Sequence, residues 1–253
     1  MSTLSMPLTD STIMLRRNLK HTLRNPVVVF QAVLFPAVIM FLFVHVFGGA
    51  FDVGGKYIDY ATPGVLVMAC SYGLGSTAAA VNSDMTKGII NRFKAMDVSR
   101  GSVLTGHVVI TTVRSLMAVA VVIGVAFAMG FRSSASALDW LGVLGLAVLL
   151  SLAAGWFTVG LGLAAKTAES AGLASVPLVM LPYISSAFVP AHSMGVGVRQ
   201  FAQYQPFTPI IETLRGLLEG NPSSSHAIAA VAWCVGFALI GYVWAVTTFN
   251  KRA

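Results

Sequence analysis

The chain has 253 residues, of which 56% are hydrophobic and only 10% are charged. Soluble domains carry about 25% charged residues, so this chain has too few polar groups to cover a water-exposed surface. Together with a mean hydropathy of +0.80, this composition excludes a free soluble enzyme, a disordered chain and a disulfide scaffold. Cys70 and Cys234 both lie in long apolar stretches, where a thiol behaves as a small hydrophobic group. The composition therefore indicates an integral membrane protein.

Long stretches without Lys, Arg, Asp or Glu locate the membrane-spanning segments, because a spanning helix needs about 20 mostly apolar residues. One predicted helix contains Arg114, which we place in its inner part. The pattern predicts an all-α protein with a single transmembrane domain over residues 1–253 and six spanning helices. The predicted spans are approximately 27–49, 60–82, 103–130, 140–165, 170–190 and 226–249.

The basic residues predict the orientation of the chain. With both termini in the cytoplasm, twelve of the 16 Lys and Arg residues fall on inner segments. The four on outer segments are Lys56, Arg132, Arg199 and Arg215. Cytoplasmic loops are enriched in basic residues, which favours this topology. The net charge of +7 then reflects topology and contact with anionic membrane lipids, and we expect no nucleic-acid partner.

Before the first predicted span, leucines and basic residues recur every four positions. The two series are Leu15, Leu19 and Leu23, and Arg16, Lys20 and Arg24. They predict an N-terminal interfacial helix that lies on the inner leaflet. The alternative is a basic flank that only fixes the orientation of the first span.

The loop between the second and third predicted spans also has helical periodicity. Its apolar positions are Met85, Ile89, Phe93 and Met96, and its polar positions are Lys87, Asn91 and Lys94. A short cytoplasmic helix with one apolar and one basic face could dock on a soluble partner. It could equally rest on its own bundle.

The fifth predicted span contains Pro177 and Pro182, so we expect it to be kinked or broken. Beyond it, a segment that starts at Thr208, a suitable helix cap, and stops at Gly220 predicts an outer, re-entrant-like helix before the last span. The apolar face of this helix comprises Ile210, Ile211, Leu214, Leu217 and Leu218. The charged residues on its other face are Glu212, Arg215 and Glu219, which could pair with one another or contact a transported molecule.

Sequence motifs for ATP binding, metal binding and nucleophilic catalysis are missing. The only Gly-Lys pair, Gly55-Lys56, is followed by Tyr57 where a phosphate-binding loop needs Ser or Thr. The five histidines are scattered, without metal-ligand spacing. We expect no catalytic residue, no metal and no cofactor on this chain. For His45 and His107, near helix ends, we expect ordinary polar contacts.

Arg114 is the one ionisable residue at membrane depth and is therefore a functional candidate. A proton- or sodium-coupled carrier would be expected to bury acidic residues in its spans, and no Asp or Glu lies in the middle of a predicted span. Energy for any transport would then come from outside the chain.

Several short motifs follow one another in the order found in a known family. They are Phe35-Pro36, Tyr60-Ala61-Thr62-Pro63-Gly64, Asp84 through Gly101, Gly130-Phe131-Arg132, Gln205-Pro206-Phe207-Thr208-Pro209 and Leu214 through Gly220. Together with the six-span pattern they resemble the permease subunit of a type-2 ABC exporter, in the daunorubicin-resistance permease family. The resemblance covers nearly the whole chain.

The resemblance implies that the loop helix is a coupling helix that fits a separate cytosolic ABC ATPase, present in two copies. The coupling residues would be Asp84, Lys87, Gly88, Arg92, Phe93 and Lys94. ATP and Mg²⁺ would bind only to the ATPase subunits, so this chain would be a transport subunit and not itself an enzyme. The resemblance further implies a multi-pass protein of the plasma membrane.

The resemblance also implies that two permease copies pair across a two-fold axis. We expect a homodimer, with a heterodimer as the alternative. Alternating access would export hydrophobic drugs, antibiotics or lipids along a path between the second and fifth helices. Candidate lining residues, chosen by position, are Tyr72, Thr77, Met180, Tyr183 and Ser186. The competing hypotheses are a non-transporting scaffold and an intramembrane enzyme, which would need convergent polar groups at membrane depth.

Overall fold

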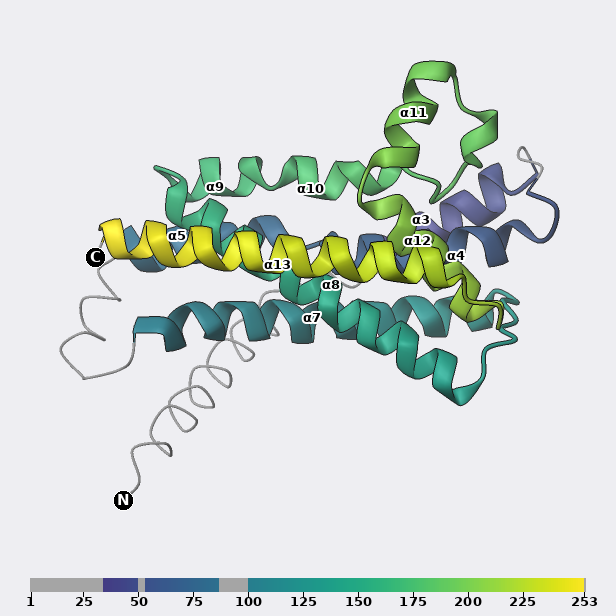
Figure 1. Ribbon diagram of the computed structural model, residues 1–253, viewed down its shortest axis with the longest axis horizontal. Coiled ribbons are helices and arrows are strands. Elements are labelled where there is room, and N and C mark those ends of the chain that lie inside the picture. The colour runs from purple at the N-terminus through teal and green to yellow at the C-terminus, as the bar shows by residue number, and fades with distance from the viewer. Residues whose placement is uncertain (1–33, 50–52, 87–99, 253) are drawn as a thin grey trace.

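The computed structural model describes residues 34–49, 53–86 and 100–252, which form helices joined by short turns, with no strand among them. The predicted interfacial helix at Leu15–Arg24 lies outside these residues and stays a prediction. Figure 1 shows an elongated bundle in which α13 runs along most of the length of the molecule.

In chain order the structure has α3 (Phe35–Leu42), the π-helical turn η2 (Phe43–Phe47), α4 (Tyr57–Ser71), α5 (Leu74–Thr86), α7 (Arg100–Ala128), α8 (Ala137–Ala164), α9 (Ala168–Ala174), α10 (Val176–Met180), the 3₁₀ turns η3 (Leu181–Ile184) and η4 (Ala191–Ser193), α11 (Val196–Tyr204), α12 (Phe207–Leu218) and α13 (Ser224–Arg252).

Four of the described helical segments are long and apolar enough to cross a bilayer. They are Tyr57–Thr86, Val103–Ala128, Ala137–Ala164 and Ser224–Lys251, and they overlap the second, third, fourth and sixth predicted spans. The first and fifth predicted spans contain shorter apolar helices, Phe35–Val46 and Ala168–Ile184. The all-helical architecture is therefore confirmed for the described residues, four of whose segments are candidate spans. The count of six spans stays a prediction.

Two of the apolar segments are interrupted. The fifth predicted span breaks into α9, α10 and η3, with Pro177 and Pro182 each in the first turn of a new helical piece, as the prolines indicate. The segment Tyr57–Thr86 breaks between α4 and α5 at Tyr72 and Gly73, where Gly73 has φ of +90°. Only glycine adopts such a φ readily. The sequence pattern did not indicate this second break.

Glycines allow close packing of α13 on α8. A Cβ added at Gly160 would lie 2.6 Å from Cε3 of Trp244, and one added at Gly241 would lie 2.6 Å from the backbone nitrogen of Phe157. Small residues at helix contacts are typical of membrane bundles, where packing replaces the hydrophobic effect between helices. The other side of α13 carries exposed apolar side chains, including Ile228, Leu239, Ile240 and Val243, as expected of a surface that faces lipid.

The helix predicted before the last span is present as α12, which begins at Phe207, and its place on the outer side stays a prediction. Its predicted apolar face is buried: Ile210, Ile211, Leu214 and Leu218 are each at most 3% exposed. The expectation that Thr208 caps the helix is wrong, because Thr208 lies in its first turn and its hydroxyl donates to the carbonyl of Ala202 at 2.5 Å. On the predicted charged face, Arg215 is only 9% exposed, whereas Glu212 is half-buried and Glu219 is exposed.

Candidate functional site

The charged face of α12 packs on α4 and on the segment after η3. The Arg215 guanidinium donates through Nη1 to Glu212 Oε1 at 2.6 Å, and through Nη2 to the carbonyls of Tyr60 at 3.1 Å and Ser186 at 3.0 Å. Its Cζ also lies 3.9 Å from the centroid of the Tyr60 ring. Glu212 and Arg215 therefore pair with each other, which was one of the two predicted possibilities.

The segment at residues 185–188 is held by side chains of α4 and α12. The Tyr57 and Tyr60 hydroxyls donate to the carbonyls of Phe188 and Ser186 at 3.1 and 2.9 Å. The Ser186 hydroxyl donates to Glu212 Oε1 at 2.7 Å. The candidate path residue Ser186 is thus only 3% exposed and belongs to this polar cluster.

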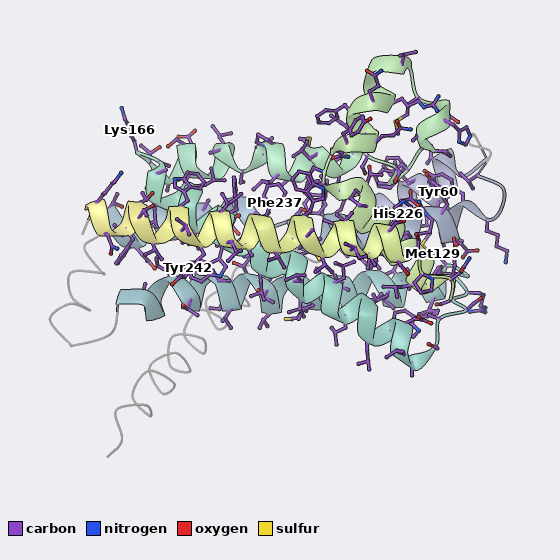
Figure 2. The ribbon with its side chains drawn as sticks, viewed as in Figure 1. Tyr60, Met129, Lys166, His226, Phe237 and Tyr242 are labelled. Carbon is purple, nitrogen blue, oxygen red and sulfur yellow. The ribbon has the colours of Figure 1, made fainter. Side chains whose placement is uncertain are left out.

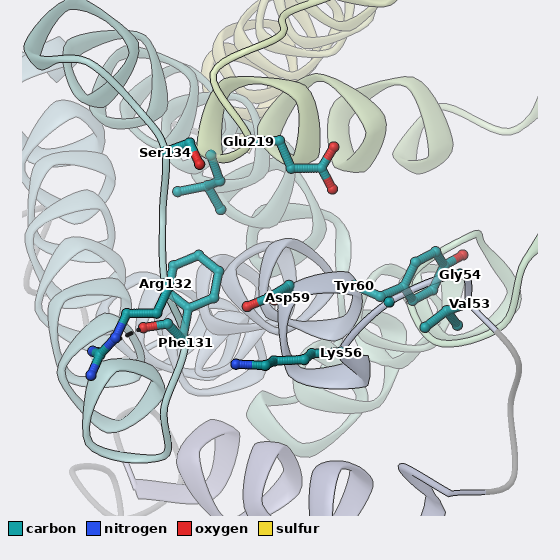
Figure 3. A pocket seen from close by; sticks show the side chains of 11 residues that line it. Val53, Gly54, Lys56, Asp59, Tyr60, Phe131, Arg132, Ser134 and Glu219 are labelled. Carbon is teal, nitrogen blue, oxygen red and sulfur yellow. Dashed lines mark hydrogen bonds between the residues drawn. The ribbon is translucent and has the colours of Figure 1, made fainter.

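Glu219 is exposed and faces a cavity of about 290 Å³, separate from the Glu212–Arg215 pair. The cavity also receives Lys56 and Asp59 from the start of α4 and Arg132 from the turn after α7. In the view of Figure 3, Asp59 lies between Glu219 on one side and Lys56 on the other. Asp59 Oδ1 is buried without a hydrogen-bond partner among the described residues. This mixed-charge cavity is where Glu219 could meet a transported molecule.

In the middle of the bundle, Thr77 is buried in a polar cluster built around Arg114. The Arg114 guanidinium donates to the Gly73 carbonyl at 2.6 Å, to Thr77 Oγ1 at 2.7 Å and to Ser76 Oγ at 3.1 Å. Thr77 Oγ1 also lies 2.9 Å from Thr111 Oγ1. Thr77 is 5% exposed and Arg114 is 8% exposed, so both serve internal contacts in this structure.

The remaining candidate path residues are Tyr72, Met180 and Tyr183, and their role stays a prediction. The hydroxyls of Tyr72 and Tyr183 contact each other directly and link the α4–α5 break to η3. The ring of Phe35 packs edge-on against Tyr72, with centroids 5.0 Å apart. Met180 is 44% exposed on α10 and is not part of this tyrosine contact.

The opposite end of the bundle carries the described part of the predicted coupling segment. Asp84, near the end of α5, contacts His107 on α7 with 3.2 Å between Oδ2 and Nε2. Asn82 Nδ2 donates to the carbonyls of Gly162 and Ala165 at 3.1 and 2.7 Å, which fixes α5 to the end of α8. Figure 2 places Lys166 at this end and Tyr60 at the other. The other coupling residues, Lys87, Gly88, Arg92, Phe93 and Lys94, lie outside the described residues.

A second cavity, of about 210 Å³, has an almost purely apolar lining. Its lining residues come from α8, α10, η3, α12 and α13, and include Phe157, Leu178, Leu181, Phe207 and Phe237. At this volume the cavity could hold only a small apolar group, because pockets for drug-sized ligands measure about 300–1,000 Å³. No group of three or more His, Cys, Asp or Glu side chains that could hold a metal ion occurs within residues 34–49, 53–86 and 100–252.

Sequence reasoning missed the partners of several of these residues. His107 was expected to make an ordinary polar contact, and Asp84 provides it. Tyr60 was noticed only within a motif, although its carbonyl, hydroxyl and ring all contact the cluster around Arg215. Asn82 lies at the end of the second predicted span, and no local pattern in the sequence indicated its hydrogen bonds to Gly162 and Ala165.

Long apolar helices with a lipid-facing surface and buried polar clusters define a multi-pass helical membrane protein. A family model for the ABC-2 type transporter matches residues 9–218, which is most of the chain. The chain therefore belongs to the ABC-2 type transporter family, and the resemblance to type-2 ABC permeases is confirmed.

Two kinds of relative are similar to the chain. The daunorubicin resistance ABC transporter permease protein DrrB1 of Streptomyces coeruleorubidus is 26% identical over 216 residues, which cover 85% of this chain and 74% of that protein. The probable doxorubicin resistance ABC transporter permease protein DrrC of Mycobacterium tuberculosis H37Rv is 25% identical over 169 residues. That match covers 66% of this chain and 61% of DrrC. The chain is thus a DrrB-like permease in sequence.

Proposed function

We propose that the chain is the membrane-spanning subunit of an ATP-driven exporter of hydrophobic drugs, antibiotics or lipids. The observation that carries this proposal is the family match over residues 9–218, joined with relatives whose names state drug resistance. ATP and Mg²⁺ bind to two copies of a separate cytosolic ABC ATPase. Two copies of the chain form the permease, with both termini in the cytoplasm of a cell whose plasma membrane they cross.

The segment between α5 and α7 couples ATP hydrolysis to the bundle. Asp84, Lys87, Gly88, Arg92, Phe93 and Lys94 contact the ATPase. The described part of the chain supports a firm attachment for this segment, because Asp84 is paired with His107 and Asn82 is bonded to the end of α8. Movement of the segment is then transmitted to α5, α7 and α8, and the paired bundles alternate between inward and outward openings.

Two features support a hydrophobic cargo that carries some charge. The apolar cavity beside Phe157 and Phe237 suits a small apolar group of such a molecule. The mixed-charge cavity with Asp59 and Glu219 lies at the end of the bundle opposite the coupling segment and suits its polar groups at the exit. Tyr72, Met180 and Tyr183 line the path between the two copies.

Co-purification tests the partnership. The tagged chain, extracted in mild detergent from its native membrane, is expected to retain a soluble ABC ATPase in equal amount, and the complex is expected to hydrolyse ATP. A chain that purifies without a nucleotide-binding partner contradicts the proposal and favours a scaffold or an intramembrane enzyme.

Charge reversal tests the coupling. Arg92→Glu and Lys94→Glu are expected to abolish daunorubicin uptake into inside-out vesicles while membrane insertion stays intact, because the contact with the ATPase loses its matching charge. Lys166→Glu is the matched control, since Lys166 is exposed at the same end of the bundle. Normal uptake by the Arg92 and Lys94 variants would refute the assignment of the coupling segment.

A further inference from the structure

The break between α4 and α5 lies within a segment of 30 residues that is otherwise long and apolar enough to span a bilayer. Tyr72 has the extended angles φ −68° and ψ 135°, and Gly73 has φ +90°. The last helical hydrogen bond of α4 runs from the Tyr72 amide to the Met68 carbonyl at 2.9 Å, and the next one runs from the Thr77 amide to the Gly73 carbonyl at 3.2 Å. In a bilayer, backbone groups released by such a break need partners from elsewhere in the protein.

Two adjacent residues of α7 supply those partners. Arg114 Nη2 donates to the Gly73 carbonyl at 2.6 Å, and the Ser115 hydroxyl donates to the Cys70 carbonyl at 3.2 Å. The Ser76 hydroxyl, from the new helix, also donates to the Gly73 carbonyl at 2.8 Å. The third predicted span thus satisfies carbonyls on both sides of the break in the second.

The polar contacts of Arg114 are hydrogen bonds around the break and include no ion pair. Among the described residues no carboxylate forms an ion pair with it; its partners are the Gly73 carbonyl and the hydroxyls of Ser76 and Thr77. A Cβ at position 73 would lie 2.9 Å from Cζ of Arg114, so the guanidinium fills the place that only glycine leaves open. Placing an arginine in the bilayer core costs free energy. Here its hydrogen bonds all go to residues at or just after the break.

The two halves of the broken segment pack against different parts of the bundle. α4 packs mainly on α7 and α12, and α5 packs mainly on α8 and α9. Glycines give the close contacts: a Cβ at Gly64 on α4 would lie 2.6 Å from that of Ala187, and one at Gly162 on α8 would lie 2.6 Å from the Ala78 carbonyl oxygen on α5. The far end of α5 carries Asp84, next to the coupling segment.

We propose that Tyr72 and Gly73 form a joint in the second span, and that Arg114 is the positioning residue that holds this joint. The proposal rests on the proposed transport function. When the coupling segment moves, α5 turns relative to α4 at this joint, against α7 and α8, which both halves contact. The Tyr72–Tyr183 hydroxyl contact passes the turn to η3, in the fifth predicted span. Arg114 adds a donor from α7 to the Gly73 carbonyl and so ties the joint to the third predicted span.

The decisive experiment removes the break in a variant, called the healed variant, in which α4 and α5 can form one continuous helix. Gly73→Ala alone is blocked by the guanidinium, so the test variant is the double substitution Gly73→Ala with Arg114→Met, which permits one continuous helix. The controls are Arg114→Met alone, which removes the guanidinium but keeps the glycine, and Gly124→Ala on α7, where an added Cβ meets nothing within 4 Å. The double variant is expected to lose more uptake than Arg114→Met alone. Each variant is purified with its ATPase partner, reconstituted, and assayed for ATP hydrolysis and for daunorubicin uptake.

The healed variant is expected to keep its ATPase partner and its ATP hydrolysis but to lose uptake by about tenfold or more, because hinge residues govern the conformational step. Uptake within about twofold of the wild-type rate would overturn the proposal. Wild-type protein that shows no ATP-dependent uptake would refute the proposed function instead. The joint would then be tested by a distance measured across the broken segment.

That distance is measured between spin labels at Lys56→Cys and Thr86→Cys, at the two ends of the broken segment, in chains whose buried Cys70 and Cys234 are replaced by alanine. Labelled chains are diluted with unlabelled copies so that only distances within one chain are recorded. The distance is expected to change between the nucleotide-free and ATP-trapped complexes in the wild type and to stay constant in the healed variant. An unchanged distance in the wild type would overturn the joint.

If the healed variant does not insert into the membrane, the single variants Arg114→Met and Arg114→Lys test the role of Arg114. Lysine keeps one donor for the Gly73 carbonyl, so uptake by Arg114→Lys is expected to exceed uptake by Arg114→Met by about fivefold. Equal, wild-type uptake by both variants would overturn the role of Arg114.

Discussion

Arg114 and Arg215 are both buried, and each binds a backbone carbonyl in an irregular part of the bundle, yet their charges are stabilised differently. Arg215, on α12, has the carboxylate of Glu212 at 2.6 Å. Arg114, in the middle of α7, has only a carbonyl and two hydroxyls as partners among the described residues. A carboxylate retains some exposure near the end of a bundle, whereas at mid-depth it would be a second costly charge. The two sites thus differ in that only Arg215 has a carboxylate partner among the described residues.

The largest effect is expected from Arg215→Met. This substitution leaves the Glu212 carboxylate without its cation, with the Ser186 hydroxyl as its remaining donor. It also removes one donor from each of the carbonyls of Tyr60 and Ser186. Breaking a buried pair in this way costs about 3 kcal/mol of unfolding free energy, toward the low end of the usual range because Glu212 is partly exposed. The loss is measured by SDS titration in mixed micelles, followed by circular dichroism. Adding Glu212→Leu is expected to restore part of it, and a double variant as unstable as the single one would contradict the pairing.

The next largest effect is expected from Gly64→Ala, which disturbs the Arg215 cluster through packing alone. The added Cβ would lie 2.9 Å from both the Cα and the carbonyl oxygen of Ala187, and backbone atoms cannot move aside as a flexible side chain does. Overpacking of this kind costs about 2 kcal/mol. Gly124→Ala, with open space around it, is the control and is expected to be neutral or slightly stabilising in the same titration. Equal stability of the two variants would show that this contact is not tight.

The difference between the two arginines also shows how far the sequence could predict this structure. Hydropathy and proline positions are local signals, so they located the apolar helices and the break in the fifth predicted span. The partner of Gly73 lies 41 positions away in the chain, and a glycine in an apolar stretch resembles any glycine at a helix contact. Burial of Arg215 likewise depends on Tyr60, 155 residues before it. Arg114 was found as a candidate because a charge at membrane depth is itself a local anomaly, but its role follows only from the fold.

A smaller effect is expected from Arg114→Met, although Arg114 is as deeply buried as Arg215. The Gly73 carbonyl keeps two other donors, the Ser76 hydroxyl at 2.8 Å and the Thr77 amide at 3.2 Å. No buried carboxylate is left behind. The substitution is therefore expected to cost about 1.5 kcal/mol, typical of one lost hydrogen bond to a charged group. The same titration checks this value, and a loss as large as that of Arg215→Met would show that the two sites do not differ as described.

The smallest effect is expected from Ser115→Ala, which removes the donor to the Cys70 carbonyl at 3.2 Å. A single buried hydrogen bond between neutral groups contributes about 1 kcal/mol, and the long distance places this one at or below that value. The control is Ser225→Ala, whose hydroxyl contacts only Ser223 at the exposed start of α13 and is expected to matter by less than about 0.5 kcal/mol. Ser115 and Arg114 bind carbonyls on the two sides of the same break. In a double variant both carbonyls lose their donor from α7, so the loss of unfolding free energy is expected to exceed the sum of the two single losses. Such a result would show that the two residues support one structural unit, and a simple sum would show that they act independently.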